Sequence, residues 1–364
     1  MAKGITIPAQ LWLPIPIASD GFVGANGTAL SAHPTDGGGH PEANGGVGKI
    51  WTHDVGAWAL NATNKAVGTP TLGAELLTDG GVENWTSATD LTSWTETIGG
   101  TTTVNREGTI IHGGTYAARI DVDATPNIGG ITQGTHITGQ WYQATAWLRS
   151  GVGTQLAGMW HANSGRAFNI STTYTQYITV YRAPNTNTGG LFGYTASNSY
   201  YMDDASWVAL TLSSLFSTVN AGTSNVKVRA KVAALTAGTQ AGVVIINNAA
   251  TPTQGIVAYF AGDGNVKVDE FTAAATWNAL ATAAKTFTAA DELELDISGT
   301  AWRCYHITAS GTAVLIGSGT FTASLGTASQ VGLFSTYSGN SFSVCSIWAK
   351  GTESQYSILD QLGA

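Results

Sequence analysis

Apolar and polar residues alternate along much of the chain, which predicts β-strands with one buried and one solvated face. From Asn225 to Ala233, three valines and an alanine alternate with two lysines and an arginine. Between Asp291 and Ile297, two leucines and an isoleucine alternate with acidic residues. Both segments are therefore predicted to be half-buried strands.

Short segments rich in Gly, Asn and Ser separate the predicted strands, for example at 262–265 and 338–341. This short spacing is typical of β-sandwiches. The Ala-rich segment from Ala273 to Ala284 could form a helix, but its Thr content and the strand patterns on both sides favour a hairpin. The pattern predicts an all-β fold, and 364 residues are enough for two domains.

The first 18 residues differ from the rest because Pro8, Pro14 and Pro16 space out Ile, Leu and Trp residues. Proline at this spacing favours an extended arm and interrupts a signal-peptide-like apolar run. The arm could pack on its own domain or dock onto a neighbouring subunit, and the sequence leaves both open. We expect a chain made without classical export.

The composition narrows the range of partners. Only 10% of the residues are charged, the formal net charge is -8, Gly occurs 46 times and 43% of the residues are hydrophobic. Nucleic-acid binding needs clustered Lys and Arg, so we expect no nucleic-acid partner. No run approaches the roughly 20 apolar residues of a membrane span, so we expect no membrane insertion. A weakly negative surface rich in Thr, Ser and Asn suits neutral glycans or other protein subunits.

Four segments between residues 72 and 211 carry motifs in a fixed order. They are 75–85 (ELLTDGGVENW), 112–120 (HGGTYAARI), 140–148 (QWYQATAWL) and 200–207 (YYMDDASW), with Trp94 after the first. In order and spacing they resemble the jelly-roll carbohydrate-binding modules of the galactose-binding-like type, whose opening reads NLLxNGxFE. The resemblance covers the whole of residues 72–211.

The chain on either side carries a second set of motifs. These are 20–30 (DGFVGANGTAL), the region 48–66 with Trp51 and Trp58, the strand 225–233 and AGVV at 241–244. They resemble a laminin-G or concanavalin-like sandwich, in which the region ending near 66 runs directly into such a strand. The resemblance implies that one jelly roll is inserted into a surface loop of the other sandwich. We expect an extended arm (1–18), a discontinuous outer sandwich (19–71 and 213–352), an inserted jelly roll (72–211) and a C-terminal tail (353–364).

The resemblance of the insert also implies two sites. One is a structural Ca²⁺ held by Glu83 and Asp203, with Asp79 and Asp204 as further candidates, although these acids could instead only satisfy strand ends. The other is a sugar site, which needs aromatic faces and polar partners. Its candidates, each of which could instead be a core residue, are Trp160, Asn163, Tyr174, Gln176, Tyr177 and Tyr181.

Two tryptophans of one predicted strand, Trp141 and Trp147, stand six residues apart and so share a face. We expect that face to be the core. Two cysteines, Cys304 and Cys345, lie in strand-like segments near the C-terminus. A disulfide between them stays open, but buried free thiols are favoured.

The sequence gives no catalytic signature. The loop from His33 to Asp54 concentrates histidines and acids, but its irregular spacing favours a solvated loop over a transition-metal site. The segment 45–49 (GGVGK) lacks the Ser or Thr of a phosphate loop. No pair of carboxylates, Gly-x-Ser-x-Gly elbow or Cys–His arrangement stands out. We expect a protein that is not an enzyme.

Modules that resemble extracellular glycan binders, in a chain without an export signal, suggest assembly in a cell that is later lysed. The favoured hypothesis is therefore a bacteriophage virion structural protein, such as a decoration, fibre or tail protein, in a homo-oligomer with other coat subunits. It would display the insert on the virion surface, for adhesion to cell-surface polysaccharide or for capsid or tail stabilisation. The alternatives are a secreted carbohydrate-binding protein of a bacterial cell surface and, third, a glycan lyase or hydrolase.

Overall fold

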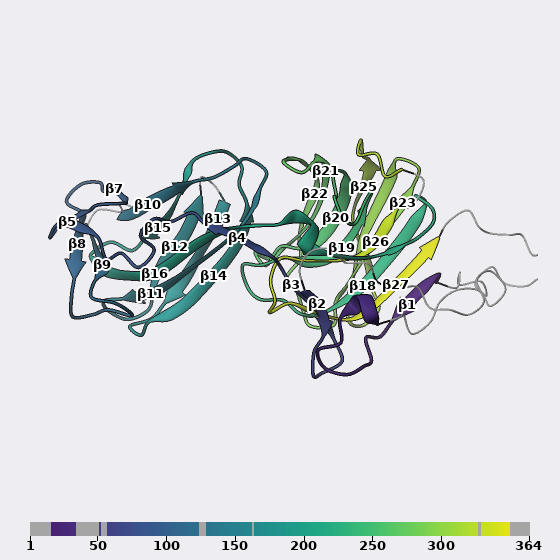
Figure 1. Cartoon of the computed structure of the whole chain (residues 1–364), viewed down its shortest axis with the longest axis horizontal. Helices are drawn as coiled ribbons and strands as arrows, with labels where there is room; N and C mark the ends of the chain where they lie inside the picture. The colour runs from purple at the N-terminus through teal and green to yellow at the C-terminus, as the bar shows by residue number, and fades with distance from the viewer. Residues whose placement is uncertain are drawn as a thin grey trace, which may run out of the picture.

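The computed structural model describes residues 16–33, 51, 57–123, 129–161, 164–326 and 329–349. Within these ranges the chain forms 27 β-strands and two short 3-10 helices, η1 (Leu30–Ala32) and η2 (Leu212–Leu215). Two antiparallel β-sandwiches lie end to end along the long axis of the molecule (Figure 1). The predicted all-β class of jelly-roll sandwiches is confirmed.

The outer sandwich contains the first and last described strands. We call one of its sheets the terminal sheet; its order is β2 (Ala57–Leu60), β3 (Ala66–Thr69), β27 (Ser341–Ala349), β18 (Val226–Ala234), β23 (Glu292–Ser298), β24 (Ala301–Ile307) and β25 (Ala313–Thr320), with β1 (Ala18–Asp20) also paired to β27. We call the other the junction sheet; its order is β17 (Phe216–Asn220), β26 (Gln330–Ser335), β19 (Ala241–Ile246), β20 (Gly255–Phe260), β21 (Asn265–Ala273) and β22 (Thr276–Ala284).

The insert is the second sandwich. Its polar sheet has the order β14 (Thr175–Arg182), β11 (Trp141–Ser150), β16 (Asn198–Leu210), β9 (Ala117–Val122) and β8 (Thr103–Glu107), with β4 (Leu72–Glu75) also paired to β16. Its glycine sheet has the order β13 (Ser164–Ile170), β12 (Gln155–His161), β15 (Thr188–Gly193), β10 (Gly129–Thr135) and β7 (Thr95–Thr97). A small hairpin joins β5 (Trp85–Ser87) and β6 (Asp90–Leu91).

The chain passes between the two sandwiches at two adjacent points. It leaves the terminal sheet after β3 and enters the polar sheet at β4, and it returns from β16 through η2 to β17. The backbone N–H of Thr211 donates to the carbonyl of Thr71 over 3.0 Å, which ties the two crossing segments together. The insert is therefore attached through two neighbouring strands rather than by a single linker.

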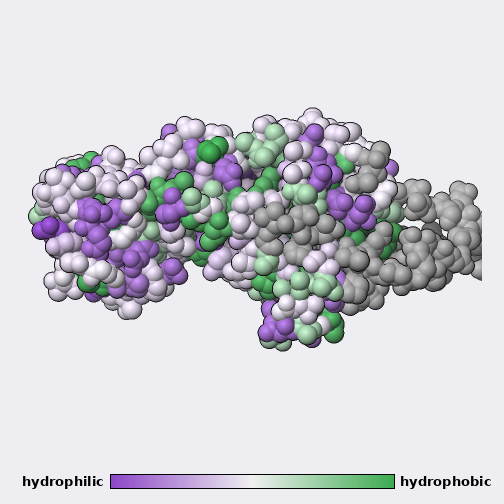
Figure 2. Space-filling model, in the orientation of Figure 1, coloured by the Kyte–Doolittle hydropathy of each residue, from purple (hydrophilic) through white to green (hydrophobic). Residues whose placement is uncertain are grey.

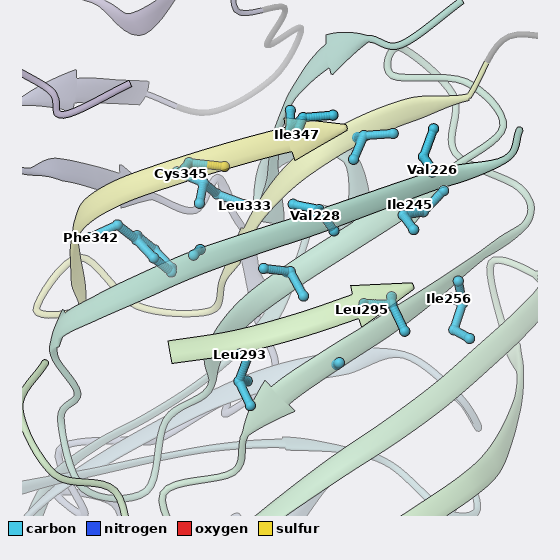
Figure 3. Packing of buried hydrophobic residues seen from close by; sticks show 14 of the residues in the cluster. Val226, Val228, Ile245, Ile256, Leu293, Leu295, Leu333, Phe342, Cys345 and Ile347 are labelled. Atoms are coloured by element: carbon cyan, nitrogen blue, oxygen red, sulfur yellow. The ribbon is translucent and has the colours of Figure 1, made fainter. Parts of the chain in front are cut away.

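The junction sheet is covered on both faces, which explains its unbroken apolar runs. All six residues of β19 and all six of β20 are buried. Alternate side chains, such as Val243 and Ile245, pack into the core of the outer sandwich, while Val244 and Ile246 face the insert. Figure 3 shows the first set: side chains of the terminal sheet meet those of the junction sheet across the sandwich, among them Val228, Leu295, Ile347, Ile245, Ile256 and Leu333.

The two cysteines belong to the core of the outer sandwich. Cys304 lies in β24 and Cys345 in β27, and both are buried free thiols, as the sequence favoured. Burial raises the pKa of each thiol above its ordinary value. Both cysteines therefore act as small apolar side chains.

Several predicted segments lie outside the described residues. They are the arm as far as residue 15, the loop residues 34–50 and 52–56, and the C-terminal tail. Among the residues that the structure describes, no helix is long and apolar enough to cross a membrane.

Candidate functional site

The outer face of the glycine sheet combines glycines with aromatic rings. Cross-strand partners in an antiparallel sheet share a face. Phe192 of β15 pairs with Gly130 of β10 and Gly158 of β12, and Trp160 of β12 pairs with Gly190 of β15. Their sequence neighbours Leu191 and Met159 point the other way, into the core of the insert. The two rings and the three glycines therefore occupy the outer face.

The glycines let the two rings lie against the backbone of the sheet. A Cβ atom on Gly190 would stand only 2.5 Å from Cε2 of Phe192. A Cβ on Gly130 would overlap the other side of the same ring, and a Cβ on Gly158 would overlap the indole of Trp160. Because glycine has no side chain, these positions leave space over the sheet that the rings fill. Phe192 and Trp160 are both half-buried, so part of each ring stays accessible.

Two further side chains extend this surface, which we call the aromatic platform. The ring of Tyr194 meets Trp160 edge to face, with centroids 6.3 Å apart and an interplanar angle of 76°. Burial raises the pKa of the Tyr194 phenol, so the hydroxyl stays neutral at physiological pH. Leu156, one row further along β12, is 40% exposed. The aromatic platform comprises Leu156, Trp160, Phe192 and Tyr194.

The platform is uncharged. The other positions that the strand register places on the same face of the described strands are Thr95, Thr97, Gly130, Thr132, Thr135, Gly158, Gly165, Ala167, Asn169, Thr188 and Gly190. None of these side chains carries a formal charge. The face therefore offers aromatic and aliphatic surface with hydroxyl and amide groups around it.

Structure comparisons give the following similarities. No protein-family model matches the sequence, and no curated protein matches it. The CBM22-1 xylan-binding domain of a xylanase from Paenibacillus barcinonensis is 11% identical over 40% of this chain and 99% of its own, with a TM-score of 0.28. The tandem CBM22 domains of the same enzyme are 8% identical over 78% of this chain and 99% of theirs, with a TM-score of 0.31.

A third similar structure holds a bound oligosaccharide. It contains the N-terminal CBM22-1 and GH10 modules of an endo-1,4-β-D-xylanase from Clostridium thermocellum, complexed with xylohexaose. It is 13% identical over 32% of this chain, with a TM-score of 0.26. The match spans about a quarter of that chain, 26%.

The predicted sugar-site residues do not gather in one place. Trp160 belongs to the aromatic platform. Tyr177 contacts Phe168 with ring centroids 4.9 Å apart and an interplanar angle of 47°, and its hydroxyl donates to the Asn169 carbonyl. Gln176 is exposed on the outer face of the polar sheet, where it pairs with Trp147.

Two of those residues lie elsewhere, and a third falls outside the described residues. Tyr181 is 5% exposed, and its hydroxyl accepts from the Trp207 indole over 2.7 Å. It is a core residue of the insert, where no sugar can stack on its ring. Tyr174 donates its hydroxyl to the carbonyl of Ile110 over 3.1 Å, so it holds the loop before β9. Asn163 lies outside the described residues.

Three of the four predicted calcium ligands accept hydrogen bonds from backbone N–H groups, and the fourth, Asp204, contacts a histidine ring. Asp79 accepts from the N–H groups of Glu83 and Asn84, both over 3.0 Å. Glu83 accepts from Thr115 over 2.8 Å and from Tyr116 over 3.2 Å.

The other two acids hold the same loop from β16. Buried Asp203 accepts from the N–H of His112 over 2.8 Å and of Gly113 over 3.2 Å. Asp204, at a φ of 44°, lies 2.6 Å from Nδ1 of His112. Burial raises the pKa of Asp203. Among the described residues, no group of three or more His, Cys, Asp or Glu side chains is placed to hold a metal ion. Calcium stays a prediction.

The prediction for the tryptophans of β11 is wrong in one respect. Trp141 and Trp147 share a face, but it is the outer face of the polar sheet, because Tyr142 and Leu148 fill the core of the insert. Trp141 is buried only because the junction sheet covers it. Trp147 is half-buried under the ring of His112, with centroids 3.7 Å apart.

Sequence reasoning missed Phe192 and the glycines of the platform. The available signal was the segment 189–193, GGLFG, in which glycine stands on either side of an aromatic residue within a predicted strand. Such glycines often mark a close approach to the backbone.

Proposed function

We propose that this chain is a non-catalytic glycan-binding protein whose insert binds a neutral polysaccharide on the aromatic platform. One observation carries the proposal: Phe192 and Trp160 lie flat against glycines on an uncharged face of a rigid sheet. The proposal also agrees with the resemblance of residues 72–211 to carbohydrate-binding modules.

The chemistry of the platform suits a sugar chain. A pyranose ring presents an apolar face of C–H groups, and it stacks on a flat aromatic ring that also excludes water. Hydroxyl and amide side chains at the rim can bond the equatorial hydroxyls, as in other small-molecule sites. Because no charge lies on the face, it offers no ion pair to an acidic glycan, and a neutral glycan can bind without having to bury a charged side chain.

A glycan array with the full chain would identify the ligand, and calorimetry would measure its affinity. We expect Trp160→Ala and Phe192→Ala each to weaken binding by about tenfold or more, since a stacked ring contributes on the order of 1–3 kcal/mol. Trp147→Ala is the matched control, because this half-buried tryptophan lies on the other sheet; its affinity should stay within twofold. Unchanged affinity in a folded Trp160→Ala variant would refute the proposal.

We further propose that the outer sandwich fixes the insert to an assembly, with a bacteriophage virion as the favoured setting and a bacterial cell surface as the alternative. In support, β1 and β27 pair side by side, and both lie at the end of the molecule away from the insert (Figure 1). Attachment near these strands would leave the insert at the free end of the molecule. Sedimentation of the purified chain, with electron microscopy, is the test; a strictly monomeric chain found on no particle would contradict the virion setting.

A further inference from the structure

A cleft of about 410 Å³ lies where the two sandwiches meet. Side chains of both sandwiches line it, including Trp141, Arg166 and Arg182 of the insert and Asp263, Lys267 and Asp269 of the outer sandwich. Its volume lies within the roughly 300–1,000 Å³ of small-molecule sites, which often occur between domains. Figure 2 shows hydrophobic residues where the two sandwiches meet. The cleft adds charged side chains to this junction.

Two of the three cations in the cleft are already paired. Arg182 donates from Nη1 to Oδ2 of Asp269 over 2.8 Å, and the Tyr259 hydroxyl donates to the same oxygen over 2.7 Å. Lys267 lies 2.9 Å from Oδ2 of Asp263. These contacts satisfy both carboxylates, so the two ion pairs leave no net charge between them.

Arg166 supplies the charge that remains. Its Nη1 donates to the backbone carbonyl of Gly262 over 2.9 Å, and its guanidinium lies 5.5 Å from the centre of the Phe168 ring. Within the described part of the chain, no carboxylate lies within ion-pair distance of Arg166; Asp263 of the same cleft acts on it only from a longer distance, and Gly262 is the one acceptor that its N–H groups reach. A half-buried guanidinium with free donors facing a cleft is a ready partner for an anion.

Arg166 belongs to the cleft and not to the aromatic platform. It pairs with Met159 across β12 and β13, so its side chain leaves the face opposite to that of Trp160. Thr282 adds a hydroxyl to the wall of the cleft. The amide of Gln240 is already bonded to the Val180 carbonyl and the Thr336 hydroxyl. One positive charge without an ion-pair partner, beside neutral polar groups, suits a ligand with one negative charge and hydroxyls.

We propose that this cleft binds a small carboxylate-bearing polyol, of the class of a sugar acid, through a forked contact between its carboxylate and the guanidinium of Arg166. The ligand would touch both sandwiches at once and therefore stabilise their packing. The site is separate from the aromatic platform and does not depend on the proposed function.

Calorimetry and thermal unfolding of the full chain with glucuronate, glucose and inorganic phosphate test the proposal. We expect glucuronate to bind at least tenfold more tightly than glucose or phosphate, and to raise the Tm. Arg166→Gln should weaken glucuronate binding by about tenfold, while Arg303→Gln, on the exposed face of β24, should leave it unchanged.

A second variant separates the site from effects on folding. Ala279 is exposed and lines the cleft, so Ala279→Phe should block entry with Arg166 still in place. We expect the same loss of glucuronate binding in that variant. Equal binding of glucose and glucuronate, equal binding of phosphate, or unchanged binding in both folded variants would each overturn the proposal.

Discussion

Both sheets of the insert carry aromatic rings on their outer faces, but only one of these faces is covered by the other sandwich. On the polar sheet, Trp141 is 3% exposed because Tyr259 and Phe334 of the junction sheet cover it. On the glycine sheet, Phe192 and Trp160 have no such cover and lie flat against glycine. The ring at the domain junction is covered by other aromatic side chains, whereas the rings that lie against glycines stay partly exposed.

The two faces also differ in the charge of the side chains around them. At the junction, the guanidinium of Arg182 lies 4.8 Å from the centre of the Trp277 ring and pairs with a nearly buried Asp269. This pair, in which only the Asp269 carboxylate is nearly buried, links the two sandwiches across the junction. The aromatic platform carries no charge, so nothing on it competes with stacking.

The largest effect should come from removing the covered ring. Trp141→Ala would leave a cavity among Tyr259, Trp277 and Phe334, and we expect the free energy of unfolding to fall by about 3–5 kcal/mol. Trp147→Ala, on the same strand and face, should cost only about 1 kcal/mol, because that ring is half-exposed and loses mainly its contact with His112. Denaturant unfolding followed by circular dichroism measures both. Equal losses would mean that the junction adds no stability.

A smaller effect is expected at the open face. Gly190→Ala would push Cε2 of Phe192 away from the sheet, and overpacking of this kind typically costs about 1–3 kcal/mol. Because the ring would tilt, affinity for the platform's glycan should also fall, without loss of any ring. Gly153→Ala is a comparison at a glycine with open space around it, although its φ of 54° adds its own strain. Full affinity in a stable Gly190→Ala variant would show that flatness of the ring is unimportant.

The alternation of apolar and polar residues predicts the strands, but it does not predict which face of a sheet is buried. Period-two patterns gave the strands, and the segment Ala273–Ala284 forms the second strand of a hairpin, β21–β22, as favoured. The same pattern placed Trp141 and Trp147 on one face, but not on the correct one, because burial of Trp141 comes from a domain that docks from outside. Tyr181 shows the reverse error: its strand is at the sheet edge, yet its ring points inward. Which face of a sheet another domain covers depends on tertiary packing, and a local sequence pattern does not show it.

The last difference between the two regions is how acid changes their stability. Near neutral pH this effect on the free energy of unfolding is the smallest of those predicted. Beneath the glycine sheet, His136 and His161 are buried with ring centroids 4.0 Å apart, whereas none of the described residues that line the cleft at the junction is a histidine. Burial, and then the neighbouring His161, lower the pKa of His136 to about 4, and burial lowers that of His161. Both rings are therefore neutral in the folded insert at pH 7.

Because the folded pKa lies below the unfolded value of about 6.5, the unfolded chain takes up these protons first. The stabilisation is complete above about pH 6.5 and is lost as the pH falls from there toward about 4. We expect the free energy of unfolding to decline through this window, and His136→Gln to flatten the decline, since glutamine can still bond the Tyr181 hydroxyl without titrating. Unfolding curves at several pH values between 7.5 and 4.5 measure the slope. An equal slope in the His136→Gln variant would assign the acid sensitivity to other groups and leave the core beneath the platform no more acid-sensitive than the junction.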